Sequence, residues 1–195
     1  MRNLLYIRCS RHIIQWAYNS YGEPAEFPAL GNENAVIRRF LCKPPTAVFS
    51  ETEKEEQLEF FKKEARRTHK SFHDLSDPDY ENRLWEKTPD CFLKIVIPDS
   101  KAKPADEYHY IGPRGRAAVR EVITDLFKIN LWSELKDVAD RKTKLAILIS
   151  AWCELHGIDI DYEDTVRQMF YRMRQQHAEK GVILNPPTRI KKNLQ

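Results

Sequence analysis

Apolar side chains in the carboxy-terminal half of the chain recur at the three- and four-residue spacing of amphipathic helices. The first stripe comprises Val119, Val122, Ile123 and Leu126. The second comprises Leu145, Leu148, Ile149, Trp152 and Leu155. The third comprises Val166, Met169, Phe170 and Met173. These stripes predict a helical bundle over residues 112–181.

Short motifs set the expected ends of these helices. The segment NLWSELKDVAD predicts a short linking helix between the first two stripes. Gly157 is expected to end the second helix and Asp161 to cap the third. Ala146, Ile147 and Ala151 make the second helix apolar nearly all round, so we expect it to lie centrally in the core.

The amino-terminal half mixes strand and helix patterns. The β-branched run CFLKIVIP predicts a strand, and EYHYIG, residues 107–112, is expected to pair back onto it as a β-hairpin. NLLYIRC predicts a further short strand near the amino terminus. NENAVIRRFLC predicts a short helix, and the turn-rich stretch from Tyr18 to Asn34 predicts a loop.

Two more helices are predicted between Ser50 and Lys87. Ser50 and Glu53 have the spacing of a capping box, and Asp77 followed by Pro78 predicts a second helix start. The expected fold class is α+β, predominantly helical, with a small amino-terminal region containing a β-hairpin and a carboxy-terminal helical bundle. The expected boundaries are 1–111 for the mixed region, 112–181 for the bundle and 182–195 for a basic flexible tail.

Composition narrows the class of protein. The chain has 195 residues, of which 42% are hydrophobic and 31% charged, and this suits one globular domain, or one domain with a subdomain. Its four cysteines are widely scattered, as in proteins of reducing compartments. The amino terminus lacks the apolar core of a signal peptide, and the longest apolar run is far short of a membrane span. We expect a soluble, cytoplasmic protein with no membrane partner.

Positive charge gathers at the carboxy-terminal end. Residues 165–195 contain seven Lys/Arg and one Glu, a net charge of +6, against +3 for the whole chain. With about 100° per residue on a helix, Arg167, Tyr171 and Arg174 share one strip beside the apolar stripe. Lys191 and Lys192 add charge in the tail, and the preceding turn, GIDID, is of the kind found in helix-turn-helix motifs. Because arginine binds phosphates and base edges, these features predict contact with DNA or RNA.

A second candidate anion site is the segment IGPRGRAAVREV. A helix start offers free N–H groups to an anion, and Arg114 and Arg116 add positive charge. The segment lacks the Lys-Ser/Thr ending of a P-loop and the third glycine of a dinucleotide fingerprint. We expect a strand-to-helix turn with both arginines exposed, which becomes a phosphate site if the bundle brings it onto the face of Arg167 and Arg174.

Two other classes of function remain open. The protein is alternatively a structural or assembly protein that binds a protein partner or itself. The weaker alternative is a metal-dependent enzyme: Cys153/His156 and His69/His73 have the spacing of zinc ligands on a helix, but no third ligand is evident. We therefore predict no catalytic residue, no metal ligand and no cofactor, and we favour a non-enzymatic nucleic-acid-binding or regulatory protein.

Overall fold

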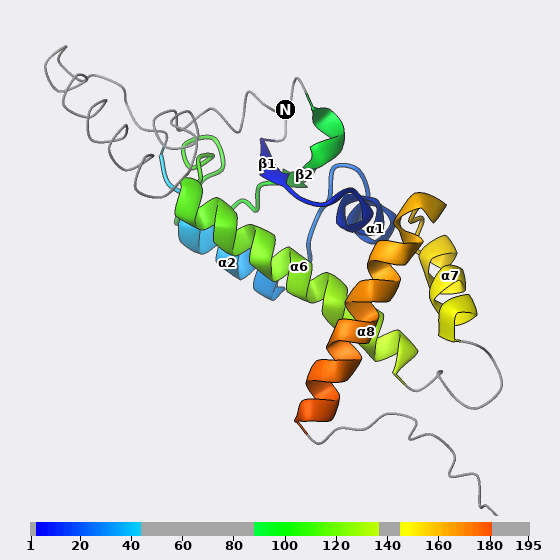
Figure 1. Ribbon diagram of the computed structural model, residues 1–195. Helices are drawn as coiled ribbons and strands as arrows, with labels where there is room; N and C mark the ends of the chain where they lie inside the picture. The colour runs from blue at the N-terminus through cyan, green and yellow to red at the C-terminus, as the bar shows by residue number, and fades with distance from the viewer. Residues whose placement is uncertain (1–2, 44–87, 137–144, 181–195) are drawn as a thin grey trace, which may run out of the picture. The chain divides into compact units, whose positions relative to one another are not determined.

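The computed structural model describes residues 3–43, 88–136 and 145–180 (Figure 1). Within these ranges the chain is mostly helical, with five α-helices and one two-stranded antiparallel sheet. The predominantly helical class is thereby confirmed. Contacts divide the chain into two compact units, 1–124 and 125–195, and the predicted boundaries at 111 and 181 stay predictions. The two helices predicted between Ser50 and Lys87 lie outside the described residues.

The sheet of the first unit joins the two predicted strands to each other. β1 (Leu4–Arg8) pairs antiparallel with β2 (Phe92–Val96), with Leu4 opposite Val96. The predicted β-hairpin between β2 and residues 107–112 is therefore wrong. After β2 the chain turns on itself, because the Asp99 carboxylate accepts a hydrogen bond from the Ala105 amide at 3.0 Å. Tyr110 then forms an isolated bridge with Cys42 instead of a ladder with β2.

Two helices accompany the sheet in the first unit. α1 (Arg11–Tyr21) buries Ile13, Ile14 and Ala17 at helical spacing, and the sequence patterns considered above did not identify it. α2 (Asn32–Phe40) confirms the short helix predicted there. The loop predicted from Tyr18 to Asn34 is correspondingly shorter, since α1 reaches Tyr21 and α2 begins at Asn32.

α6 (Pro113–Leu135) is one continuous helix. The separate linking helix predicted from residue 130 is wrong over residues 130–135, which continue α6. Its first turns lie beside α2 (Figure 1), and a Cβ atom on Gly115 would lie 2.8 Å from Phe40 Cβ and 2.5 Å from Ile111 Cγ2. Only glycine permits this approach, because real Cβ atoms are not packed so closely. Position 115 therefore fixes how closely α6 and α2 pack.

The second unit contains the end of α6, α7 (Leu145–Leu155) and α8 (Glu163–Glu179). Gly157, with a φ of +67°, follows α7 as predicted. Asp161 is not the cap of α8: a 3-10 turn over Ile160–Tyr162 intervenes, and Tyr162 is the cap residue. The main buried side chains of this unit are Phe127, Leu131, Leu135, Ile149, Trp152, Cys153, Ile158, Val166 and Phe170.

The expectation that α7 lies centrally in the core is wrong. Ile149 and Trp152 are buried, but the side chains of Ile147 and Leu155 are 58% and 71% exposed. α7 packs beside α8 and, through Trp152, against α6, while Ile147 and Leu155 present aliphatic groups away from the described part of the core. Exposure of several large apolar residues on a single helix is a feature of interaction surfaces.

Candidate functional site

α8 is held at a defined rotation by aromatic packing. Val166 and Phe170 are its buried residues. The Trp132 ring of α6 lies 5.7 Å from the Phe170 ring and stacks on His177 at 4.0 Å, with 18° between the planes. These contacts occupy one face of α8 along three turns. Helical geometry therefore directs the remaining side chains toward the two flanks and the outer face.

The first flank carries Arg167, Tyr171 and Arg174, which we call the α8 strip. The Arg167 side chain is 37% exposed and forms an ion pair with Asp164 one turn earlier. Tyr171 is 43% exposed, and Arg174 is half-buried. The α8 strip thus combines two guanidinium groups with an accessible aromatic ring. An exposed ion pair contributes only about 0–1 kcal/mol to the free energy of unfolding. The ion pair with Asp164 therefore leaves the Arg167 guanidinium available to another anion such as phosphate.

The second flank borders a hollow of about 460 Å³ between α6 and α8, which we call the α6/α8 hollow. Its lining consists of Lys128, Thr165, Gln168, Met169, Arg172, Met173 and Gln176. Among these described residues two are cations and none is a carboxylate. Lys128 Nζ lies 2.9 Å from Asp125 Oδ1 in an exposed ion pair. The sequence did not point to Lys128, because only tertiary packing brings this α6 residue against α8.

The two arginines predicted at the start of α6 differ in their exposure to solvent. Arg114 is exposed, as expected. The expectation of an exposed Arg116 is wrong, because its side chain is only 2% exposed. Arg116 Nε donates to the Ile111 carbonyl at 2.8 Å, and the guanidinium carbon lies 5.9 Å from the centre of the Tyr110 ring. Through these contacts Arg116 holds the turn before α6.

The remaining predicted site residues, Lys191 and Lys192, lie outside the described residues. Arg114 belongs to the first unit and the α8 strip to the second. The structure therefore describes a strip of three predicted residues on α8, one exposed arginine at the start of α6 and one buried arginine beside it.

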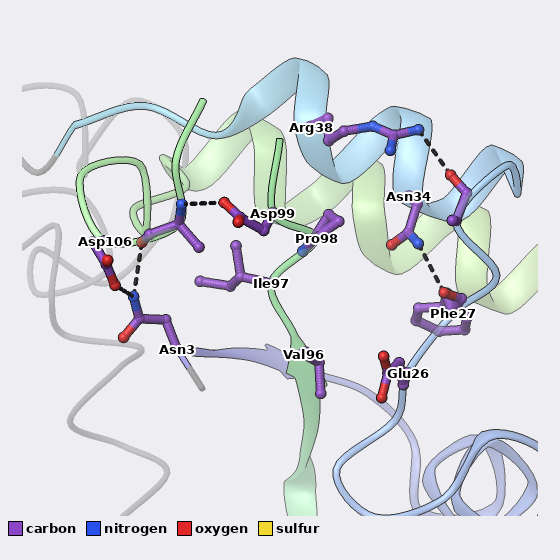
Figure 2. A pocket seen from close by; sticks show the side chains of 12 residues that line it. Asn3, Glu26, Phe27, Asn34, Arg38, Val96, Ile97, Pro98, Asp99 and Asp106 are labelled. Carbon is purple, nitrogen blue, oxygen red and sulfur yellow. Dashed lines mark hydrogen bonds between the residues drawn. The ribbon is translucent and has the colours of Figure 1, made fainter. Parts of the chain in front are cut away.

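A separate hollow of about 450 Å³ lies in the first unit (Figure 2). Its polar side chains hold the surrounding loops: Asn34 Nδ2 donates to the Phe27 carbonyl at 2.8 Å, and Arg38 donates to the Ala29 carbonyl at 3.1 Å. Asn3 Nδ2 donates to the Ala105 carbonyl at 2.8 Å. These hydrogen bonds account for the shape of the hollow, as Figure 2 shows for Asn34 and Arg38.

Carboxylates outnumber cations in the lining of that first-unit hollow. Glu26, Asp99 and Asp106 line it together with one cation, Arg38. The Arg38 guanidinium donates to a backbone carbonyl, and Asp99 accepts the Ala105 amide. The excess of carboxylates repels phosphate. The first-unit hollow is therefore unsuited to a nucleic-acid backbone.

The cysteine–histidine pair considered as a metal site serves the core instead. Cys153 is fully buried, and burial, with a smaller contribution from Glu163, raises the pKa of its thiol to about 11. A thiol that stays protonated is a poor metal ligand. His156 Nε2 lies 3.0 Å from Glu134 Oε2, the oxygen that also accepts the Trp152 indole N–H at 3.0 Å. No group of three potential metal ligands occurs in the described ranges, and His69 and His73 lie outside them.

Glu134 is the polar centre of the α6–α7 contact. Burial alone would raise the pKa of its carboxyl group, but hydrogen bonds from His156, Asn130 and Trp152 outweigh burial and lower the pKa from its ordinary value. The charged form is thus favoured by Asn130 of α6, Trp152 of α7 and His156 just after α7. Glu134 therefore ties the end of α6 to α7.

No family model matches this chain, and no curated protein or solved structure matches it either. Over residues 3–43, 88–136 and 145–180, no helix is long and apolar enough to cross a membrane. The surface features with the most distinctive chemistry are the α8 strip and the α6/α8 hollow, which place cations, amides and an aromatic ring around one helix.

Proposed function

We propose that this protein is a non-enzymatic nucleic-acid-binding or regulatory protein that contacts the phosphate backbone through α8 and the basic carboxy-terminal segment. The observation that carries this proposal is the orientation of α8. Its aromatic packing faces inward, and Arg167 and Tyr171 remain accessible on a segment of net charge +6. Guanidinium groups pair with phosphate oxygens, and an exposed tyrosine offers a platform for a base.

The individual residues have distinct proposed roles. Arg167 and Arg174 contact phosphates, and Tyr171 lies between them along the helix. Lys191 and Lys192 add backbone contacts from the tail, where each cation releases a counterion on binding. Arg114 is proposed as an accessory phosphate contact from the first unit. Arg116 is assigned a structural role, since its guanidinium is buried.

The experiment is binding of fluorescent single-stranded and duplex DNA and RNA across a salt series. The wild type is compared with Arg167→Glu/Arg174→Glu and with a truncation after Gly181. The matched control is Arg39→Glu/Lys101→Glu, which changes the net charge equally through two exposed cations of the first unit. We expect affinity to fall steeply with salt, and the α8 variant to bind roughly tenfold or more weakly with a salt slope reduced by about two.

The control decides whether charge or position matters. If the α8 variant and the control lose affinity equally, binding is a general effect of net charge. Loss only in the truncation assigns binding to the tail alone. Absence of binding at about 50 mM salt, where phosphate contacts are strong, contradicts the proposal.

A second candidate function, assembly through protein contacts, is favoured by one observation. Leu155 and Ile160 are 71% and 79% exposed around the α7–α8 turn of the second unit, and Ile147 near the start of α7 is half-exposed. Apolar groups exposed in this way mark protein interfaces. Light scattering of the wild type and of Leu155→Glu/Ile160→Glu tests this alternative: assembly requires a mass above that of one chain in the wild type and a lower mass in the variant.

A further inference from the structure

Three hollows formed by the described residues differ in charge. The first-unit hollow is lined by three carboxylates and one arginine. A hollow at the α7–α8 turn is lined by Glu154, Asp159 and Glu163 with no cation among its described residues. The α6/α8 hollow has the opposite character, with Lys128 and Arg172 and no described carboxylate. An anionic ligand therefore meets favourable electrostatics at the α6/α8 hollow and repulsion at the other two.

The side chains of the α6/α8 hollow divide into a charged part and an apolar part. Lys128 extends from α6 and Arg172 from α8, and Arg172 has no ion pair within the described part of the chain. Met169 and Met173, one turn apart on α8, contribute half-buried thioethers. Methionine is polarisable and makes favourable contacts with aromatic rings. This combination suits a ligand that carries both a negative charge and a flat ring.

Size and surroundings limit the form of that ligand. The volume of about 460 Å³ is in the range of pockets for small molecules, and it admits a single base with its phosphate. Bases inside a duplex are stacked and paired, and they enter a pocket only after being flipped out at an energetic cost. Bases of a single strand are accessible without that cost. Gln168 and Gln176 also line the hollow and offer amide groups to base edges.

We propose that the α6/α8 hollow binds one unpaired nucleotide of a single-stranded nucleic acid, with its phosphate on Lys128 and Arg172 and its base against Met169 and Met173. This inference rests on the proposed nucleic-acid function and makes it more specific. Single strands are the preferred form, and the α8 strip, on the opposite flank of α8, binds further phosphates along the same strand. The exposed ion pair of Lys128 with Asp125 does not prevent this contact, because exposed pairs are weak.

The test compares three fluorescent probes at one salt concentration: a single-stranded deoxyadenosine oligomer, an abasic single strand of the same length, and the corresponding duplex. The variants are Arg172→Ala in α8 and Lys180→Ala at its C-cap, which remove one positive charge each, although Lys180 does not line the hollow. We expect the wild type to bind the single strand at least about fivefold more tightly than the abasic strand, as expected for contact with one base.

The two variants locate the contact. Arg172→Ala is expected to lower the affinity for the single strand and to reduce the ratio of single-strand to duplex affinity. Lys180→Ala is expected to leave this ratio unchanged. Equal binding of all three probes by the wild type, or an unchanged preference in Arg172→Ala, overturns this inference and leaves backbone binding by the α8 strip in place. Absence of binding to every probe overturns the proposed nucleic-acid function as well. Circular dichroism of both variants verifies that α8 remains folded.

Discussion

The start of α6 and the middle of α8 are similar in sequence, since each carries closely spaced arginines on a helix next to apolar positions. Their arginines nevertheless have different environments. Arg116 is 2% exposed and donates to a backbone carbonyl, whereas the Arg167 side chain is 37% exposed and pairs with an aspartate at the surface. One arginine maintains the fold, and the other is accessible to a ligand.

The difference arises from the residues that surround each helix. At α6, the Arg116 side chain is enclosed, with the Ile111 carbonyl and the Tyr110 ring beside its guanidinium. At α8, the Trp132 contacts occupy one face, and Arg167 and Tyr171 on the neighbouring flank remain partly exposed. An arginine's role therefore depends on whether a neighbouring element covers its helix face, and a count of charges in the sequence does not reveal this.

The largest expected effect is on Arg116. Arg116→Ala removes a buried guanidinium, leaves the Ile111 carbonyl without this donor and opens a cavity, so we expect the free energy of unfolding to fall by about 2–4 kcal/mol. The matched substitution Arg114→Ala is expected to change it by less than about 0.5 kcal/mol. Urea denaturation of both variants measures the difference. Equal effects of the two substitutions would remove the contrast drawn between these neighbouring arginines.

A smaller effect is expected at Gly115. Alanine favours a helix over glycine by about 1 kcal/mol, but its Cβ would collide with Phe40 Cβ, and overpacking costs about 1–3 kcal/mol. We expect Gly115→Ala to lower the free energy of unfolding by about 1–2 kcal/mol. A stabilised variant would contradict the close packing of α6 on α2. Gly112→Ala is the control, since its added Cβ would meet nothing within 4 Å.

A still smaller effect concerns Glu134 and pH. The pKa of its carboxyl group is lowered in the folded protein from an ordinary value of 4.5. The carboxylate therefore contributes fully to the free energy of unfolding above pH 4.5, and this contribution is lost as the pH falls through the lower pKa of the folded protein. Because the side chain is 39% exposed, we expect the carboxylate to contribute less than about 1 kcal/mol to the free energy of unfolding. Glu134→Gln should flatten the loss of stability below pH 4.5. If the free energy of unfolding of Glu134→Gln depended on acidic pH as it does in the wild type, the Glu134 carboxylate would not contribute to stability.

The smallest effect on stability is expected on the flank of α8. Arg172 has no described ion pair, and exposed substitutions of this kind change the free energy of unfolding by less than about 0.5 kcal/mol. Thermal unfolding of Arg172→Ala measures this value. A loss above about 1 kcal/mol would give Arg172 a structural role similar to that of Arg116 and would weaken the contrast between the two helices.

The sequence patterns predicted most of the described helices and both strands, because apolar periodicity records which face of an element is buried. They did not predict that β2 pairs with β1, since strand pairing depends on the loop after β2, where Asp99 holds the Ala105 amide. α1 was missed although Ile13, Ile14 and Ala17 have helical spacing. The burial of Arg116 and the position of Lys128 depend on contacts between distant segments, which local patterns do not contain.

The most direct test of the account is the mapping of backbone amide resonances during titration with a single-stranded oligonucleotide at about 150 mM salt, where weak charge contacts are screened. We predict that the perturbed amides cluster on α8 between Thr165 and Gln176 and around Lys128. Perturbations confined to residues 181–195, or located in the first unit, would contradict the claim that α8 carries the binding surface.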